Sequence, residues 1–181
     1  MNEITDLFTQ NGADAYYGEP VTQLAHALQC AQLAEEAGAD AETIAAAFLH
    51  DIGHMLPVPD GTAYMDDYGT VDHEGLGADF LRQQGFPEKV AQLVEHHVNA
   101  KRYLVFKNAE YRARLSEASQ QTLLFQGGPM TADEAATFEQ HPYFKPIIQL
   151  RLWDERAKLI DHVTPDAAHY LAIAAQVRSV Q

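Results

Sequence analysis

Cysteine and long apolar runs are scarce in this sequence. Cys30 is the only cysteine among 181 residues, which excludes an internal disulfide and favours a reducing compartment. We expect Cys30, which has apolar neighbours in a helical stretch, to be a small buried hydrophobic residue rather than a nucleophile. No apolar run approaches the roughly 18 residues of a membrane helix, and the N-terminus lacks the segments of a signal peptide. These absences predict a cytoplasmic protein with no membrane partner.

Basic residues are also few. The chain has 12 lysines and arginines against 26 aspartates and glutamates, for a net charge of −14. This balance disfavours nucleic acid as a partner, since binding to a phosphate backbone needs clustered cations. A small anionic substrate stays compatible with it, because bound metal ions and a few local cations can dominate a buried site.

Apolar residues at helical spacing are what the sequence has in quantity. Hydrophobic residues make up 46% of the chain, and no low-complexity tract interrupts them. Asp40 predicts the start of a helix whose apolar face includes Ile44, Phe48 and Ile52. No strand pattern or internal repeat is evident. We therefore predict an all-α fold of about eight helices around one core, a single domain over residues 1–181 with a C-terminal packing helix over 164–181.

A histidine followed directly by an aspartate ends this apolar helical pattern. His50 and Asp51 offer a neutral nitrogen and an anionic oxygen to the same small volume, and such a pair can hold a divalent or trivalent metal ion. Adjacent helical positions diverge by roughly 100°, so further ligands must come from other helices. One such dipeptide is weak evidence by itself, because many chance pairs only cap or solvate a helix end.

Further candidate ligands stand in separate helical segments. His26 lies beside an apolar stripe, where a lone histidine is more often a hydrogen-bonded structural residue than a ligand. His73 opens a later helix, His97 lies on the next one, and Asp154 follows near the far end of the chain. A set of nitrogen and oxygen ligands without sulfur favours iron or manganese over zinc or magnesium.

Several polar residues lie at helical spacing from these candidates. Lys101 is four residues after His97, so it can hold an anionic group beside the metal, although spacing alone favours a surface cation. Ser119 and Thr122 are neighbours at i and i+3 that can donate to one oxyanion or merely mark a helix start.

Two more positions and a loop have similar alternatives. His54 is four residues after His50, where it can reach a substrate or cap a helix end. Arg151 and Asp154, at i and i+3, are either a surface ion pair or part of the site. The loop over residues 55–69 carries side chains that can bind a cationic group or form a solvated face, the latter favoured for the aspartates: Tyr64, Asp66, Asp67 and Tyr68.

The order of the candidate ligands resembles the ligand pattern of the HD-domain superfamily over nearly the whole chain. Most members of that superfamily are metal-dependent phosphohydrolases. Other blocks point to a different branch, the HD-domain mixed-valence diiron oxygenases of the PhnZ type, which cleave the C–P bond of 1-hydroxyphosphonates. The blocks are Tyr16-Tyr17-Gly18-Glu19, Gln23-Leu24-Ala25-His26, Ala100-Lys101-Arg102-Tyr103-Leu104, Gln126-Gly127-Gly128-Pro129-Met130 and Trp153-Asp154-Glu155-Arg156-Ala157-Lys158.

The resemblance implies a role for each of these positions in a core over about residues 16–158. One iron would be held by His26, His50, Asp51 and Asp154, and the other by His73, His97 and the bridging Asp51. Tyr16 and Glu19 match residues that cover the irons until substrate binds. Positions around the phosphonate are matched by His54, Lys101, Ser119, Thr122 and Arg151.

The activity implied by the resemblance is oxidative. A pair of irons in the Fe(II)/Fe(III) state, with O2 as cosubstrate, would convert 2-amino-1-hydroxyethylphosphonate or its N-trimethyl analogue to phosphate and glycine or glycine betaine. A hydroxylase dependent on Fe(II) and 2-oxoglutarate would supply the substrate. The alternatives are a metal-dependent phosphohydrolase for nucleotides or small phosphate monoesters, and a non-catalytic binding module, which the intact ligand set disfavours.

Overall fold

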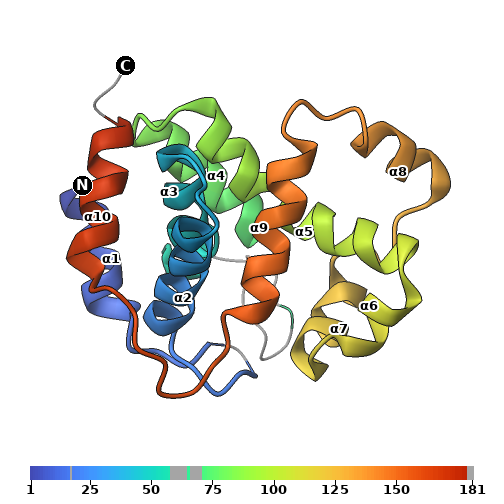
Figure 1. Cartoon of the computed structure of the whole chain (residues 1–181), viewed down its shortest axis with the longest axis horizontal. Coiled ribbons are helices and arrows are strands. Elements are labelled where there is room, and N and C mark those ends of the chain that lie inside the picture. Colours follow the sequence, from blue (N-terminus) through green and yellow to red (C-terminus); the bar gives the residue numbers. More distant parts are fainter. Residues whose placement is uncertain (17, 58–64, 66–70, 179–181) are drawn as a thin grey trace.

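The protein is described by a computed structural model over residues 1–16, 18–57, 65 and 71–178 (Figure 1). The all-α prediction is confirmed, with ten α-helices rather than about eight in this part of the chain. Tyr17, Tyr64, Asp66, Asp67 and Tyr68 lie outside the described residues. The helices are α1 (Asn2–Asn11), α2 (Gln23–Glu36), α3 (Ala41–Leu49), the 3-10 helix η1 (Ile52–Met55), α4 (His73–Gln83), α5 (Glu88–Lys107), α6 (Ala109–Arg114), α7 (Glu117–Phe125), α8 (Ala132–Phe138), α9 (Phe144–Arg156) and α10 (Ala167–Arg178).

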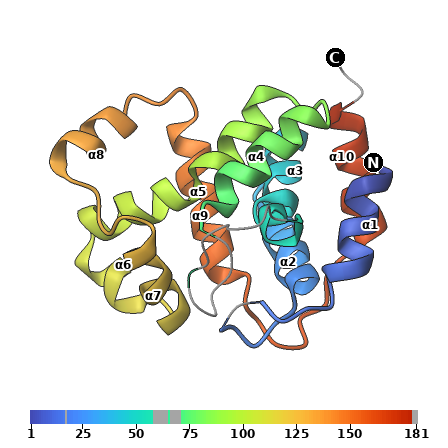
Figure 2. The same cartoon turned by 180° about the vertical axis from the view of Figure 1, so that it is seen from behind.

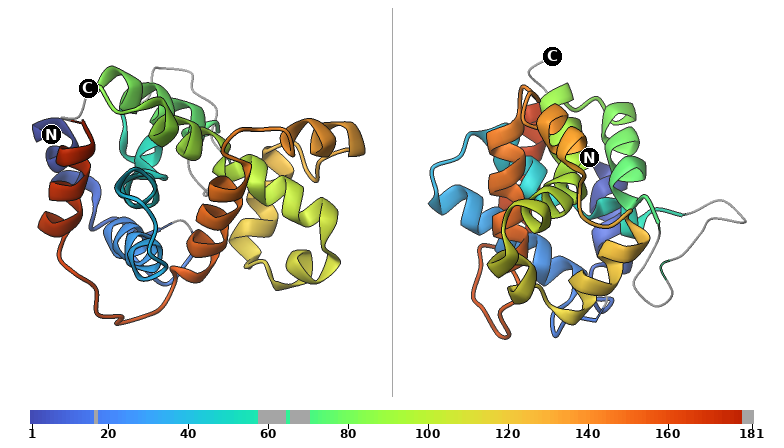
Figure 3. Two further views of the ribbon diagram at one scale, coloured as in Figure 1. Left: turned by 45° about the horizontal axis from the view of Figure 1, so that its top comes forward. Right: turned by 90° about the vertical axis from the view of Figure 1, so that its right-hand side faces the viewer.

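Helix α3 lies at the centre of the bundle. It packs against α2, α5 and α10, and α9 lies across both α2 and α5 (Figures 1 and 2). Ala45, Ala46, Ala47 and Leu49 on α3 have no exposed surface. Helices α6, α7 and α8 lie on the far side of α9 from α10, around the C-terminal half of α5 (Figures 1 and 3). A second, smaller apolar cluster holds α6 and α7 to α5.

The starts of the helices that lead into the core follow from their capping residues. The side chain of Thr22 accepts a hydrogen bond from the backbone N–H of Ala25 at the start of α2. Asp40 caps α3 in the same way through Thr43, as its sequence position predicts. Gly38 lies between α2 and α3 and adopts φ 72°, a backbone conformation that is strained for residues with a side chain. This glycine therefore marks the end of α2.

Helices η1 and α4 approach so closely that only glycine fits between them. A Cβ atom on Gly53 would lie 1.9 Å from the backbone oxygen of His73, and one on Gly77 would lie 3.2 Å from the nitrogen of Gly53. Gly77 therefore lies where another backbone approaches α4 closely. This contact brings the start of α4 beside the residues that follow α3.

Helix α9 ends before the apolar residues of its segment do. Ile147, Ile148, Leu152, Ala157 and Ile160 are at helical spacing, which by itself predicts a helix to Ile160, but α9 ends at Arg156 and Ile160 is 66% exposed. The chain beyond α9 is irregular and turns back toward α2, where the backbone of Leu159 bonds with the side-chain amide of Gln29. Lys158 therefore leaves the helical register and lies at the base of α9.

Candidate metal centre

Buried histidines from four helical segments meet in the core. His26 comes from α2, His50 follows the last residue of α3, His73 begins α4 and His97 lies on α5; none is more than 4% exposed. The rings are oriented by backbone carbonyls: the Nδ1 atoms of His26, His50 and His97 lie 2.9, 2.9 and 2.7 Å from the oxygens of Ala157, Ala47 and Val94. A carbonyl oxygen only accepts, so each Nδ1 carries a proton, and in the neutral ring each Nε2 presents a lone pair.

These lone pairs point at one another. The Nε2 atoms of His26 and His50 lie 3.1 Å apart, and those of His73 and His97 lie 3.2 Å apart. Two acceptors at that distance repel unless a cation lies between them. The arrangement therefore fits metal ligation, and a hydrogen bond at Nδ1 sets the orientation of the rings of His26, His50 and His97.

A carboxylate lies between the two histidine pairs. Oδ1 of Asp51 is 3.4 Å from Nε2 of both His73 and His97. Its Oδ2 is 3.3 Å from Nε2 of His50 and 3.6 Å from that of His26. One oxygen therefore faces each pair, as a carboxylate that bridges two metal ions requires.

Asp154 lies beside His26 and His50 and forms with them the first ligand group; His73 and His97 form the second. Oδ1 of Asp154 lies 3.3 Å from Nε2 of His26 and 3.8 Å from that of His50. This atom and Oδ2 of Asp51 are buried without a hydrogen-bond donor. Such orphaned acceptors are costly unless a cation satisfies them. Close donor groups are formed by His26 with His50 and Asp154, and by Asp51 with His54 and His73.

Two aromatic rings cover this cluster. The ring of Tyr16 stacks on His26 with centroids 4.0 Å apart, and His54 stacks on His73 at 3.9 Å. Burial of the Tyr16 hydroxyl, reinforced by the charge of Asp51, raises the pKa of Tyr16 well above its ordinary value. Burial and the neighbouring His73 lower the pKa of His54 well below its ordinary value, so its ring is neutral.

Lys101 lies inside the cavity, so its alternative as a surface cation is wrong. It is 3% exposed, and its ammonium donates to Oγ1 of Thr122 at 2.9 Å. Burial, assisted by the positive charge of Arg151, lowers the pKa of Lys101 to about 7. The lysine is therefore poised to gain a full charge when an anion arrives beside it.

Arg151 is buried as well, which excludes its alternative as part of a surface ion pair. Its Nη1 donates to Oδ2 of Asp154 at 2.5 Å, and its Nε donates to the hydroxyl of Tyr111 at 3.1 Å. Nη2 donates to Glu155 and to Oγ of Ser119, the latter at 3.5 Å. Burial opposes ionisation of Asp154, but the adjacent guanidinium keeps the pKa of Asp154 well below its ordinary range.

Glu19 is fixed at the mouth of the same cavity by Ser116 and Lys158, which were not predicted as site residues. Its Oε1 accepts a hydrogen bond from Oγ of Ser116 at 2.5 Å and one from Nζ of Lys158 at 2.7 Å. The ammonium of Lys158 is also 3.4 Å from Oγ of Ser119. The presence of Lys158 in one of the family-like blocks was the only signal for it, because the apolar pattern of α9 gave it no special place.

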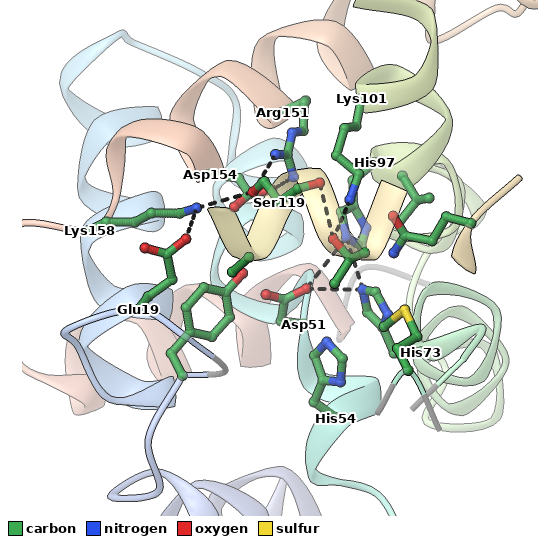
Figure 4. Close-up of a pocket in the computed structure, with 16 residues that line it drawn as sticks. Glu19, Asp51, His54, His73, His97, Lys101, Ser119, Arg151, Asp154 and Lys158 are labelled. Atoms are coloured by element: carbon green, nitrogen blue, oxygen red, sulfur yellow. Dashed lines mark hydrogen bonds and ion pairs between the residues drawn. The ribbon is translucent and has the colours of Figure 1, made fainter. Parts of the chain in front are cut away.

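One cavity joins these groups (Figure 4). His26 and His50 lie behind its wall, and the remaining predicted site residues line it: Tyr16, Glu19, Asp51, His54, His73, His97, Lys101, Ser119, Thr122, Arg151 and Asp154. His96 does not reach it, since its ring hydrogen-bonds Asn99 and lies against His141. Of these two adjacent histidines, His97 is therefore the one that faces the cavity.

Residues 24–125 match the model of the HD domain family. The chain belongs to the HD-domain family. The matched range includes the four histidines of the cluster and Asp51. Asp154 lies outside this range, and it is assigned to the cluster by its distance to His26. Membership of the family together with the buried donor groups shows a metal-dependent protein.

Three relatives align with this HD domain over most of their lengths. A [1-hydroxy-2-(trimethylamino)ethyl]phosphonate dioxygenase (glycine-betaine-forming) of Leisingera caerulea is 46% identical over 92% of this chain and 84% of its own. A hydroxymethylphosphonate dioxygenase of Gimesia maris is 41% identical over 92% of this chain and 84% of its own. An uncharacterized protein of Acanthamoeba polyphaga mimivirus is 44% identical over 88% of this chain and 73% of its own.

These relatives confirm the resemblance to HD-domain phosphonate oxygenases. Two of them are named for dioxygenase activity on a small organophosphonate, one with and one without an amine substituent. No helix in the described part of this HD domain is long and apolar enough to span a membrane.

Proposed function

We propose that this protein is an iron- and O2-dependent oxygenase that cleaves the C–P bond of a 1-hydroxy-2-aminoethylphosphonate, with the amine free or N-trimethylated. The observation that supports the proposal best is the pair of histidine groups that share Asp51, placed beside a pocket for an anion. The names of the two phosphonate dioxygenases point in the same direction. The products are inorganic phosphate and glycine or glycine betaine.

The metal ligands divide into two sets. We assign His26, His50, Asp51 and Asp154 to one iron, and His73, His97 and the second oxygen of Asp51 to the other. A purely nitrogen and oxygen donor set suits iron. The chemistry that a bound Fe(II)/Fe(III) pair supplies is activation of O2 and oxidation of the carbon that carries the hydroxyl group.

Cations and hydroxyl groups on the opposite wall bind the phosphonate. Lys101 and Thr122 come from α5 and α7, and Ser119 lies one turn before Thr122. The lysine neutralises part of the dianion and the two hydroxyls donate to its oxygens. The ion pair of Arg151 with Asp154 orients this metal ligand, and the positive charge of Arg151 attracts the anion.

Tyr16 and His54 shape the rest of the pocket. Tyr16 lies over His26 and near Asp51, so it covers the first ligand group and must move for a substrate to reach it. Its raised pKa keeps the phenol protonated. His54 lies flat on His73 and closes the pocket beside the second group, where a neutral ring supports a ligand histidine without adding charge.

The reaction balances with one O2 for each phosphate. The C–P bond breaks, the carbon is oxidised to a carboxylic acid, and both atoms of O2 are accounted for in the two products. We expect the substrate to come from a hydroxylase dependent on Fe(II) and 2-oxoglutarate, which inserts the hydroxyl group required here, and we expect both enzymes to work in the cytoplasm.

A substrate panel tests this proposal. Iron-loaded protein is incubated in air and under strict anaerobiosis with 2-amino-1-hydroxyethylphosphonate, its N-trimethyl analogue and hydroxymethylphosphonate, and phosphate release is measured. Release from at least one of the two amine-bearing compounds that requires O2 supports the proposal, and their relative kcat/KM values identify the amine. Release from phosphate monoesters without O2, with every phosphonate left intact, would contradict it and indicate a phosphohydrolase.

A further inference from the structure

His73 differs from the other three clustered histidines in the group that faces its outer nitrogen. The Nδ1 atoms of His26, His50 and His97 each lie beside a backbone carbonyl. Nδ1 of His73 instead lies 3.3 Å from Oε2 of Glu74, the next residue of α4. A carboxylate therefore takes the place that a neutral carbonyl has at the other three rings.

The two atoms of this contact have no other polar partner. Both are buried, and among the described residues neither Nδ1 of His73 nor Oε2 of Glu74 makes a hydrogen bond. Glu74 forms no ion pair with a lysine or arginine in that part of the chain, and its side chain is only 16% exposed. Buried polar groups without partners are costly, and a small rotation of the carboxylate would turn this contact into a hydrogen bond from Nδ1.

A carboxylate in the first turn of a helix can also act through the helix dipole alone. Asp72 already provides such a charge at the start of α4. It has φ 62°, and a Cβ atom on Gly75 would lie 2.6 Å from its Oδ1. Asp72 is exposed, whereas Glu74 is turned toward the ring of His73. The start of the helix therefore does not require the carboxylate of Glu74.

The two ligand groups also differ in their own charge. The first has Asp154 in addition to the shared Asp51, and Arg151 neutralises part of the charge of Asp154. Among the described residues, Asp51 is the only carboxylate that faces the Nε2 atoms of the second group. The second group thus has no carboxylate of its own, and Glu74 places one behind a ligand instead.

We propose, on the basis of the metal binding included in the function proposed above, that Glu74 is a positioning residue of the second ligand group. It accepts the Nδ1 proton of His73, which fixes the ring with Nε2 toward the metal ion. Its negative charge makes the ring a more basic ligand. Glu74 therefore raises the affinity of the second group for a cation and lowers the reduction potential of an iron bound there. The first group, whose histidines face neutral carbonyls, should change little without it.

Metal affinity separates the charge of Glu74 from its place in the helix. Glu74→Gln keeps the length of the side chain and an oxygen that can accept from His73, but it removes the charge. One of the two Fe(II) ions, titrated anaerobically against a competing chelator, should bind about 10- to 100-fold more weakly, and the other should keep its affinity.

Asp72→Asn is the matched control. It removes an equal charge at the same helix start, and asparagine tolerates the positive φ of this position. This variant should bind both Fe(II) ions as the unsubstituted protein does. Glu74→Asp, which keeps the charge on a shorter side chain, should recover part of the affinity that Glu74→Gln loses.

The midpoint potential of the bound iron provides a readout that a loss of folding stability alone does not shift. At iron concentrations that saturate both sites, Glu74→Gln should raise a midpoint potential and Asp72→Asn should not. Neither measurement requires turnover, so both can be made whether or not a phosphonate is cleaved. Unchanged affinities or potentials in Glu74→Gln, or an equal loss of affinity in Asp72→Asn, would overturn the proposal even if phosphonate cleavage is established.

Discussion

The Nε2 atoms of His26 and His50 lie 3.1 Å apart although the Nδ1 atom of each ring already donates to a backbone carbonyl. Because each Nδ1 already has its proton in a hydrogen bond, the facing Nε2 atoms can be joined only by a bound cation or by an added proton. The Nε2 atoms of His73 and His97 also face each other, and in this pair it is the Nδ1 atom of His97 that donates to a carbonyl. The fold therefore builds two electron-rich sites and connects them through Asp51.

Metal content should follow this division. We expect the unsubstituted protein to bind two irons per chain, and His26→Gln or His73→Gln to lose about one each, because each substitution affects only one histidine pair. Asp51→Asn should lower the affinity for both, since each carboxylate oxygen faces one pair. Elemental analysis after anaerobic loading and desalting measures the content. Full loading of all three variants would show that these residues are not the ligands.

Replacement of Lys101 should weaken turnover rather than metal binding. Lys101→Met removes a charge-assisted hydrogen bond worth about 1.5 to 3 kcal/mol, so kcat/KM for the phosphonate should fall about 10- to 100-fold. Iron content should not change, because the ammonium contacts Thr122 and no candidate ligand. Steady-state kinetics at pH 6.5 with parallel metal analysis tests this. An unchanged kcat/KM would remove Lys101 from the anion site.

The lowered pKa of Lys101 should also appear in the stability of the metal-free protein. Burial and Arg151 lower the folded-state pKa from 10.5 to about 7, so between these values the unfolded chain binds more protons than the folded one. The free energy of unfolding contributed by this residue should therefore rise with pH from 7 toward 10.5, by up to about 1.4 kcal/mol per pH unit. Urea unfolding of the unsubstituted protein and Lys101→Met between pH 7 and 9 should differ by this slope. Parallel pH profiles would contradict the shift.

A side chain at Gly53 should displace the backbone of His73 and so disturb the metal site. Gly53→Ala places a Cβ atom 1.9 Å from the backbone oxygen of His73, so α4 must shift. We expect a loss of about 1 to 3 kcal/mol of stability, and of the iron assigned to His73 and His97. Asp40→Ala is the control: loss of its helix cap costs about 1 kcal/mol but should leave the iron content intact. Normal iron binding by Gly53→Ala would contradict the coupling.

Most of the fold was predictable because its signals are local. Helical periodicity, the caps at Asp40 and Thr131, and the stop at Gly38 each act within a few residues. The short α6 gave no such signal, since only six residues form it and Tyr111 is its buried residue. A helix extended to Ile160 would be a wrong prediction, because apolar residues at helical spacing do not reveal that the chain leaves the helix after Arg156.

The candidate site was also predictable only in part. The order of histidines and aspartates along the chain indicated which residues converge, and the structure brings them together. The role of each residue stays a prediction. Ser116 and Lys158 were not predicted because their importance comes from contacts with Glu19, which lies 97 and 139 residues away, and no spacing rule connects these positions. Tyr111 and Glu155 were missed for a related reason, as they matter only through the buried Arg151.

The stoichiometry of O2 consumption against phosphate release is the most direct test of the proposed oxygenase activity. Iron-loaded protein is given a limiting, known amount of O2 in a sealed cell with excess N-trimethylated or free-amine 1-hydroxyphosphonate, and both quantities are followed to completion. We predict one phosphate for each O2, with release stopping when O2 is exhausted. Phosphate release that continues without O2, or O2 uptake with no phosphate formed, would contradict it.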